Sequence, residues 1–301
     1  MIVAAVQTPE LAEAVGEVDG VEVVLWPTGE PQPPRADEVA FVVPDYIRAR
    51  STMRRLGSLL GLRAVQLQTA GYDAVLDLAP AGAELLSARG VHDDATAELA
   101  LGLTIAALRG IDVAVRESGH WRQDTTRRSL ADSRVAILGY GSIGRAVAAR
   151  MLACRAQVTG VATSARDDDL VGRVVTAADV DWAAQHVVVV VLPLSEATRH
   201  VVDAAFLARL ADGTLVVNVG RGPLLDTDAV LAEAGRLSFA LDVTDPEPLP
   251  DDHPLWTAPG VLVTPHVAGG TTAMLPRMAA LVRDQLERLR DGQPLRNVVP
   301  R

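Results

Sequence analysis

The apolar positions of the second half of the chain form a series of short strands separated by helical stretches. Six segments are rich in Val, Leu and Ile and apolar at most positions: residues 134–138, 157–161, 187–192, 214–219, 237–243 and 261–264. Strands that are apolar on both faces are typical of a parallel sheet covered by helices on both sides. This region therefore predicts a doubly wound α/β domain.

The first hundred residues show a similar alternation. We expect strands at residues 1–6, 21–25, 39–43 and 63–67, and a helix at residues 51–60. A longer helix with an apolar stripe is expected at residues 94–108, with Asp93 or Asp94 as its cap. An amphipathic helix at residues 271–291 lies beyond the second series and could return to the first domain. The pattern as a whole predicts an α/β fold with two doubly wound parallel-sheet domains.

Composition and charge exclude several classes of function. The chain has 301 residues, a net charge of -10 and 28 basic residues, all of them Arg. Nucleic-acid binding is disfavoured because phosphate contacts need clustered positive charge, and the absence of Lys excludes Schiff-base chemistry and the Gly-Lys-Ser/Thr phosphate loop. The single cysteine, Cys154, excludes an intramolecular disulfide, and the six histidines show no metal-ligand spacing. With no apolar run of about 20 residues, we expect a cytoplasmic protein without a membrane span or a metal.

The strand at residues 134–138 runs directly into a glycine-rich turn, Gly-Tyr-Gly-Ser-Ile-Gly, which a helical stretch follows. In this context Gly139 allows the tight turn, Gly141 lets a pyrophosphate approach the backbone, and Gly144 permits close packing of helix and strand. The N-terminus of the helix would present free N–H groups to the phosphates. The motif predicts a dinucleotide-binding domain, although a purely structural tight turn is the alternative.

The residues after the second strand of this domain bear on the choice of nicotinamide cofactor. An acid that holds the ribose 2′-hydroxyl of NAD is expected there, but the position is Ala162. Thr163, Ser164 and Arg166 follow and could hold the 2′-phosphate of NADP. Against this, residues 167–169 are three consecutive aspartates beside Arg166. We expect NAD(P), with a preference for NADP.

Charged side chains follow three later strands of the same predicted sheet. Arg221 follows one strand, Asp242 and Glu247 follow the next, and His266 follows the last. Ligands bind beyond the carboxyl ends of the strands in open parallel sheets. An arginine can grip a carboxylate, and a histidine paired with an acid can exchange a proton with a hydroxyl group. Each residue alone is more simply a structural group, but their joint placement predicts hydride transfer on a 2-oxo or 2-hydroxy acid.

With these residues in place, the chain resembles the D-isomer-specific 2-hydroxyacid dehydrogenases, which include phosphoglycerate dehydrogenase and glyoxylate/hydroxypyruvate reductase. The resemblance covers nearly the whole chain. The matching segments are residues 139–144, Pro193-Leu194-Ser195 with Thr198-Arg199-His200, residues 218–222, residues 241–243 with residues 247–249, and Pro265-His266. In the first domain, residues 68–73 resemble the family's substrate loop.

The resemblance implies a role for each matching residue. Arg221 would bind the substrate carboxylate and carbonyl, His266 would be the acid/base, and Glu247 would be its partner. The N–H groups of Ala70 and Gly71 would also bind the substrate carboxylate. The full set of expected cofactor contacts is Gly139, Gly141, Ser142, Ile143, Gly144, Ala162, Thr163, Ser164, Arg166, Pro193, Thr198, Val219, Asp242 and Gly269.

The domain organisation and the alternatives follow from the same resemblance. It implies a substrate domain of residues 1–94 and 270–301, a Rossmann dinucleotide-binding domain of residues 95–269, and a homodimer. A member of this fold can also act as a nucleotide-binding sensor or corepressor without turnover. A formate dehydrogenase would have Gln in place of Glu247, and a methyltransferase would not explain the Arg, Glu and His. The identity of the substrate stays open, and we expect Tyr72 and Trp121 to be packed side chains rather than substrate contacts.

Overall fold

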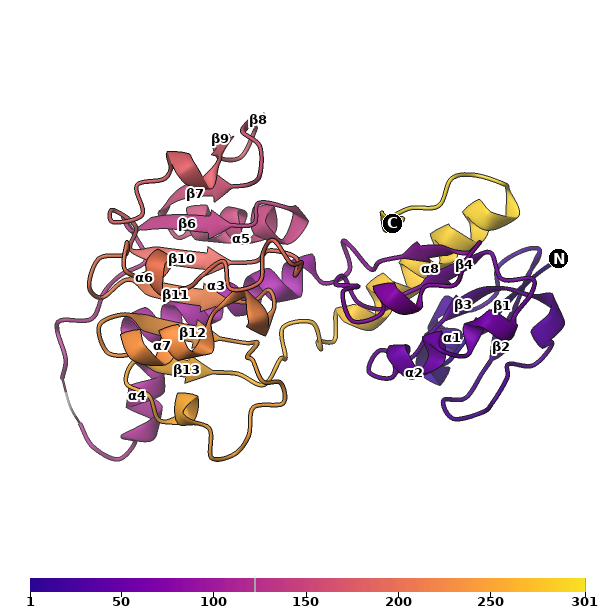
Figure 1. Cartoon of the computed structure of the whole chain (residues 1–301), viewed down its shortest axis with the longest axis horizontal. Helices are drawn as coiled ribbons and strands as arrows, with labels where there is room; N and C mark the ends of the chain where they lie inside the picture. Colours follow the sequence, from indigo (N-terminus) through magenta and orange to yellow (C-terminus); the bar gives the residue numbers. More distant parts are fainter. Residues whose placement is uncertain (122, 301) are drawn as a thin grey trace. The chain divides into compact units, whose positions relative to one another are not determined.

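The computed structural model describes residues 1–121 and 123–300, which divide into two compact units. One unit contains Met1–His92 together with the chain from Thr271 onward, and the other contains Asp93–Gly270. Each unit has its own parallel sheet (Figure 1). The predicted α/β class, with two doubly wound domains, is confirmed.

The larger unit is built on an eight-stranded sheet in the order β13-β12-β11-β10-β6-β7-β9-β8. The strands are β6 (Arg134–Leu138), β7 (Gln157–Val161), β8 (Arg166–Asp168), β9 (Gly172–Val175), β10 (Val187–Val190), β11 (Leu215–Asn218), β12 (Ser238–Leu241) and β13 (Val261–Val263). All pairs are parallel except β8 with β9. The chain moves from β6 to β7 on one side and later returns to β10 on the other. The glycine-rich turn after β6 therefore lies at the point where the strand order reverses, where ligands bind in such sheets.

Helices cover both faces of this sheet (Figure 1). The helices are α3 (Asp93–Arg109), α4 (Ile111–Arg116), α5 (Ser142–Ala153), α6 (Ala204–Leu207) and α7 (Thr227–Glu233). Alternate residues of β6 show the two faces: Val135 and Ile137 pack in the core with α3 and α5, whereas Ala136 and Leu138 pack in the core with α6 and α7. This alternation explains why central strands such as β10 and β11 are apolar at nearly every position.

The smaller unit has a five-stranded parallel sheet in the order β2-β1-β3-β4-β5. Its strands are β1 (Ile2–Val6), β2 (Val21–Leu25), β3 (Val39–Val43), β4 (Ala64–Gln66) and β5 (Glu84–Leu86), and its helices are α1 (Pro9–Val15), α2 (Ala49–Met53) and α8 (Met274–Arg290). The last helix, α8, packs with α1 on one face of the sheet. The C-terminal segment therefore belongs to the same compact unit as the N-terminal residues.

The structure corrects several local predictions. The helix expected at residues 51–60 is only the short α2 and a single 3-10 turn, Leu56–Ser58. The helix α3 begins at Asp93, so both aspartates lie in its first turn, where their negative charges interact favourably with the helix dipole. Trp121 was expected to be packed, but it is 97% exposed. The hairpin of β8 and β9 was not predicted at all.

No helix in the described part of the chain is long and apolar enough to cross a bilayer. A cytoplasmic location stays a prediction. Likewise, no group of three or more His, Cys, Asp or Glu side chains among residues 1–121 and 123–300 is arranged to hold a metal ion.

Candidate active site

A buried carboxylate forms the turn that carries His266. Asp242, at the end of β12, is 1% exposed. Its carboxylate accepts hydrogen bonds from the Thr264 hydroxyl at 2.7 Å and from the N–H groups of Val267 at 2.9 Å and Ala268 at 3.0 Å. The N–H of His266 donates to the Asp242 carbonyl at 2.8 Å. Four hydrogen bonds to one residue thus fix the backbone on both sides of His266, which itself has a positive φ of 51°.

The His266 ring is paired with Glu247. Its Nδ1 lies 2.5 Å from Glu247 Oε1, and both side chains are about two-fifths exposed, at 40% and 41%. This hydrogen bond and the negative charge of Glu247 raise the pKa of His266, although burial works in the opposite direction. The same hydrogen bond lowers the pKa of Glu247. The pair therefore favours a protonated imidazole with Nδ1 oriented by the carboxylate, which leaves Nε2 as the ring nitrogen that can exchange a proton.

The turn that carries Arg221 is held by Asn218, the last residue of β11. The fully buried Asn218 side chain accepts the Gly220 N–H at 3.1 Å and donates to the Arg221 carbonyl at 2.9 Å. The next residue must be Gly, because a Cβ on Gly222 would lie 1.9 Å from the carbonyl oxygen of Thr244. This close approach brings the Arg221 turn against the loop that leads to Glu247.

Arg221, Glu247 and His266 lie close enough to influence one another. The positive charge of Arg221 lowers the pKa of both Glu247 and His266. All three residues follow the carboxyl ends of neighbouring parallel strands, β11, β12 and β13. A cavity of about 230 Å³ adjoins the pair and is lined by Asp242, Thr244, Glu247, Pro248, Leu249, Trp256, Val263, Thr264, Pro265 and His266. The larger unit thus brings the three charged residues together at the carboxyl ends of its parallel strands.

The glycine-rich turn has the shape that a dinucleotide requires. Gly139 has a φ of 111°, and a Cβ there would lie 2.7 Å from the Val191 backbone. A Cβ on Gly144 would lie 2.3 Å from the carbonyl oxygen of Gly139, which explains the close contact of α5 with the turn. A Cβ on Gly141 would meet nothing within 4 Å. Protein packing therefore does not require Gly141, and the open space beside it fits a pyrophosphate.

The N-terminus of α5 is available to an anion. Gly141 is its N-cap, and no side chain from the described residues caps it. Ser142 and Ile143 are the first two residues of the helix, so their N–H groups precede the first intrahelical donor, that of Arg145. Free N–H groups and the helix dipole favour a negative charge at this position.

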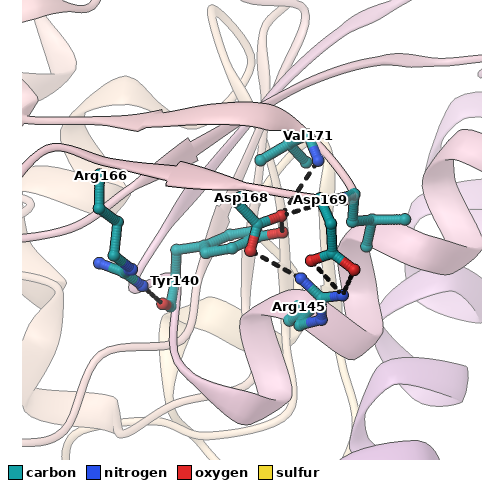
Figure 2. Close-up of polar contacts among 7 residues, drawn as sticks. Tyr140, Arg145, Arg166, Asp168, Asp169 and Val171 are labelled. Atoms are coloured by element: carbon teal, nitrogen blue, oxygen red, sulfur yellow. Dashed lines mark hydrogen bonds and ion pairs between the residues drawn. The ribbon is translucent and has the colours of Figure 1, made fainter.

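The segment after β7 is anchored to the glycine-rich turn. Ala162 is half-buried, and Thr163 and Ser164 are exposed. Arg166, the first residue of β8, donates from Nη2 to the Tyr140 carbonyl at 2.7 Å (Figure 2). The Tyr140 hydroxyl donates to Asp168 at 2.9 Å, and Asp168 also pairs with Arg145 at 2.6 Å. Two of the three aspartates that follow Arg166, Asp168 and Asp169, are thus paired with Arg145.

The other expected cofactor contacts lie at the same edge of the sheet. Pro193 follows β10, and its carbonyl accepts the Thr198 hydroxyl at 2.8 Å, which closes the loop between them. Val219 follows β11 and is buried. Gly269 follows the turn that Asp242 holds, three residues after His266. None of these positions lies on the opposite edge of the sheet.

The expected substrate loop belongs to the smaller unit. Thr69 closes it by a hydrogen bond from its hydroxyl to the Gly71 carbonyl at 2.6 Å, and His92 Nε2 lies 2.7 Å from the Gln68 carbonyl. The N–H groups of Ala70 and Gly71 have no hydrogen-bond partner in the described part of the chain. Two adjacent free N–H groups suit a carboxylate.

Sequence reasoning missed the residues that hold the site in place. Asn218, Tyr140, Asp168 and Arg145 bind no expected ligand. Asp168 bonds to Tyr140 and Arg145, which precede it by 28 and 23 residues, whereas Asn218 bonds within its own turn. One signal was available for Tyr140: a Cβ on Gly160 would lie 2.5 Å from its ring. The unusual glycine in the middle of β7 therefore marks a large side chain packed on the strand.

Comparison with known proteins agrees with this geometry. The family model for the D-isomer specific 2-hydroxyacid dehydrogenase NAD binding domain matches residues 101–268. An uncharacterized protein of Corynebacterium melassecola is 32% identical over 78% of this chain and 81% of its own length. A hydroxypyruvate reductase of Thermotoga maritima is 28% identical over 81% of this chain and 85% of its own. The structure of an NADPH-dependent glyoxylate/hydroxypyruvate reductase of Sinorhizobium meliloti, in complex with NADP and sulfate, superposes with a TM-score of 0.82 at 26% identity, covering 99% of this chain and 98% of its own.

The family model spans more than half of the chain, so the chain belongs to the D-isomer specific 2-hydroxyacid dehydrogenase family. It is an NAD(P)-dependent oxidoreductase that acts on 2-oxo and 2-hydroxy acids.

Proposed function

We propose that the protein is an NADP-preferring reductase of small 2-oxo acids in which His266, Glu247 and Arg221 carry the chemistry. The observation that supports this most strongly is the 2.5 Å pair of His266 and Glu247 beside Arg221, in the unit that also contains the glycine-rich turn. A histidine with a raised pKa can give a proton to a carbonyl oxygen, and an arginine can bind a carboxylate.

The chain's own residues would act on the substrate as follows. Arg221 binds the carboxylate and polarises the carbonyl. In the smaller unit, the free N–H groups of Ala70 and Gly71 are the donors that suit a carboxylate. A nicotinamide held in the larger unit would supply the hydride that C2 of the 2-oxo acid accepts. His266, protonated at Nε2, gives its proton to the carbonyl oxygen, while Glu247 stabilises the imidazolium and fixes the ring. In the reverse direction the neutral imidazole accepts the hydroxyl proton.

The turn after β6 has the residues that a dinucleotide would need. The space beside Gly141 and the uncapped N-terminus of α5 would take the pyrophosphate, with Ser142 and Ile143 as N–H donors. Pro193, Thr198, Val219, Asp242 and Gly269 would line the nicotinamide side along the same edge. We therefore propose Asp93–Gly270 as the dinucleotide-binding domain and the other unit as the substrate domain.

The preference for NADP is supported by the end of β7. Ala162 offers no carboxylate to a ribose 2′-hydroxyl, and Thr163, Ser164 and Arg166 follow it. The negative charge that counts against a phosphate there is reduced, because Arg145 pairs with Asp168 and Asp169. A relative with the same fold is described as NADPH-dependent.

A substrate panel tests the proposal. Glyoxylate and hydroxypyruvate, which the relatives' names point to, and phenylpyruvate as a larger 2-oxo acid are each offered with NADPH and with NADH, and the loss of reduced nicotinamide absorbance is measured. We expect turnover with at least one of the small acids and a higher kcat/KM with NADPH. Tight NADPH binding without turnover of any 2-oxo acid would contradict the proposal and favour a nucleotide sensor.

We further propose that the protein is a homodimer. Large apolar side chains are exposed on α4 and on the segment after it: Ile111 at 48%, Val115 at 69% and Trp121 at 97%. Isolated exposed apolar residues are ordinary, but three within eleven positions suit a surface that a second copy covers.

A further inference from the structure

The hairpin of β8 and β9 is attached to the glycine-rich turn through one residue, Tyr140 (Figure 2). Side chains alternate along a strand, so Arg166 and Asp168 lie on the same face of β8. They contact opposite ends of Tyr140: Arg166 binds its backbone carbonyl at 2.7 Å and lies over its ring, and Asp168 accepts its hydroxyl at 2.9 Å. Two residues of β8 therefore contact Tyr140.

Tyr140 is itself firmly held. It is only 4% exposed, and its ring occupies the space above Gly160 in β7, where any larger residue would collide with it. Burial, with the hydrogen bond to Asp168 as a second cause, raises the pKa of Tyr140 to about 12, so the hydroxyl keeps its proton and acts as a donor. The hydroxyl is therefore a fixed anchor for the hairpin at neutral pH.

Asp168 is the point where the contacts of the hairpin converge. Its side chain is 12% exposed. It accepts the Tyr140 hydroxyl, the N–H groups of Leu170 at 3.0 Å and Val171 at 3.1 Å, and the Arg145 guanidinium at 2.6 Å. Three neutral donors and one guanidinium thus satisfy the carboxylate, and the pair with Arg145 offsets its negative charge. Asp168 therefore fixes the hairpin to both Tyr140 and Arg145.

We propose that Tyr140 and Asp168 are positioning residues for recognition of the cofactor 2′-phosphate, because they hold Arg166 against the glycine-rich turn at the end of β7. This inference rests on the proposed preference for NADP. In doubly wound folds an arginine near the end of the second strand accommodates the 2′-phosphate. An arginine on a free loop loses side-chain entropy when it binds, whereas a hairpin anchored at both ends of Tyr140 has already lost much of that freedom.

The test uses the dissociation constants of NADPH and NADH, measured by fluorescence titration without substrate. Arg166→Ala tests the cofactor preference itself, and we expect it to abolish the preference for NADPH. Tyr140→Phe tests the positioning role, because it keeps the ring on Gly160 and the pair of Asp168 with Arg145 but removes the hydroxyl. We expect Tyr140→Phe to weaken NADPH binding about fivefold, a loss that corresponds to roughly 1 kcal/mol, and to leave NADH binding within about twofold.

A double variant and a control separate positioning from general stability. Adding Tyr140→Phe to Arg166→Ala should cause no further loss of NADPH binding, since residues that act through one another are not additive. Asp169→Asn is the matched control, because Asp169 also pairs with Arg145 but is 85% exposed, and this variant should weaken the binding of neither NADPH nor NADH. Equal weakening of NADPH and NADH by Tyr140→Phe, or the same loss in the Arg166→Ala background, would overturn the positioning role while leaving the cofactor preference intact. A wild-type protein that binds both cofactors equally would overturn the preference and this inference together.

Discussion

At the scale of single residues, the protonation of His266 is the property on which turnover depends. Its pKa is raised by the hydrogen bond and charge of Glu247 and lowered by burial and by Arg221. The balance keeps the imidazole protonated to a higher pH than an isolated histidine. Arg221 therefore lowers the pKa of His266, and Glu247 compensates by raising that pKa.

Replacing Glu247 with Gln tests this balance. Reduction of a 2-oxo acid needs the protonated ring, so activity falls as pH rises through the pKa of His266. Without the charge of Glu247 that pKa falls, and the basic limb of the kcat/KM profile for reduction should move to lower pH. Asp251→Asn, an exposed acid in the same loop, should leave the profile unchanged. A basic limb that stays in place in Glu247→Gln would show that the pair does not control activity.

Arg221→Lys tests the need for a bidentate cation. A lysine keeps the charge but has no planar pair of donors for a carboxylate. We expect KM for the 2-oxo acid to rise at least about tenfold, with the dissociation constant of NADPH nearly unchanged. Steady-state kinetics and cofactor titration on the same preparation separate the two effects, and equal losses in both would place Arg221 on the cofactor instead.

At the scale of elements, the shape of the turn between β13 and Gly270 depends on Asp242 more than on the turn's own residues. A buried carboxylate that receives three hydrogen bonds gives the turn its shape, and each bond to a charged group contributes roughly 1.5–3 kcal/mol. The resemblance implied that Asp242 contacts the cofactor, whereas the structure shows its oxygens engaged with the protein. A carboxylate has capacity for a further donor, so both roles are compatible.

Asp242→Asn should therefore lower both stability and kcat. The amide group of Asn would face an N–H donor at either Val267 or Ala268, so at least one hydrogen bond is lost. We expect a lower Tm and a fall in kcat on the order of tenfold or more, with Thr264→Val, which removes one of the three bonds, causing a smaller change in each. An unchanged kcat would mean that His266 does not depend on this turn.

Gly102 offers a prediction about the stability of α3. It lies in the middle of the helix, is exposed, and has no neighbour within 4 Å of a Cβ placed there. Gly102→Ala should raise the free energy of unfolding by about 0.5–1 kcal/mol, because Ala loses less backbone entropy in a helix. Urea denaturation measures the change. A decrease would show that another surface covers this face of α3.

The elements that sequence predicted well are those with a simple physical signal. The strands β6 and β7 were located to the residue. Four consecutive buried apolar residues mark β6, whereas β7 is marked by three partly or fully buried apolar or glycine positions among polar ones. The strand β8 was missed because Arg166 to Asp168 are charged and are held by Tyr140 and Arg145, although Val174 of β9 is buried in the core. The candidate residues could be assigned to strand ends from their positions in the sequence. The contacts that hold them, such as those of Asp242 with the turn of His266, could be identified only from the folded structure.

At the scale of the whole molecule, the family assignment explains why one unit contains all three charged residues and the glycine-rich turn, while the loop of Ala70 and Gly71 belongs to the other. The sequence alone did not reveal the exposed apolar residues of α4 and of the segment after it, where Trp121 was expected to be packed. Their exposure is a property of the folded monomer, and it bears on assembly rather than on chemistry.

The dimer proposal is tested by Val115→Glu. A charge in the middle of an apolar contact should dissociate the dimer, so sedimentation velocity should show a shift to the mass of the 31.8 kDa monomer. Glu117→Gln, on the same segment, should leave the mass unchanged. A wild-type protein that sediments as a monomer would refute the proposal.

The central claim is that His266 exchanges a proton with the substrate while reduced nicotinamide is consumed. The most direct measurement compares wild type with His266→Gln in reduction of hydroxypyruvate or glyoxylate by NADPH, with NADPH binding measured in parallel. The account predicts a fall in kcat of about 10²–10⁴-fold with the dissociation constant of NADPH changed less than about threefold. A variant that keeps wild-type kcat would contradict it.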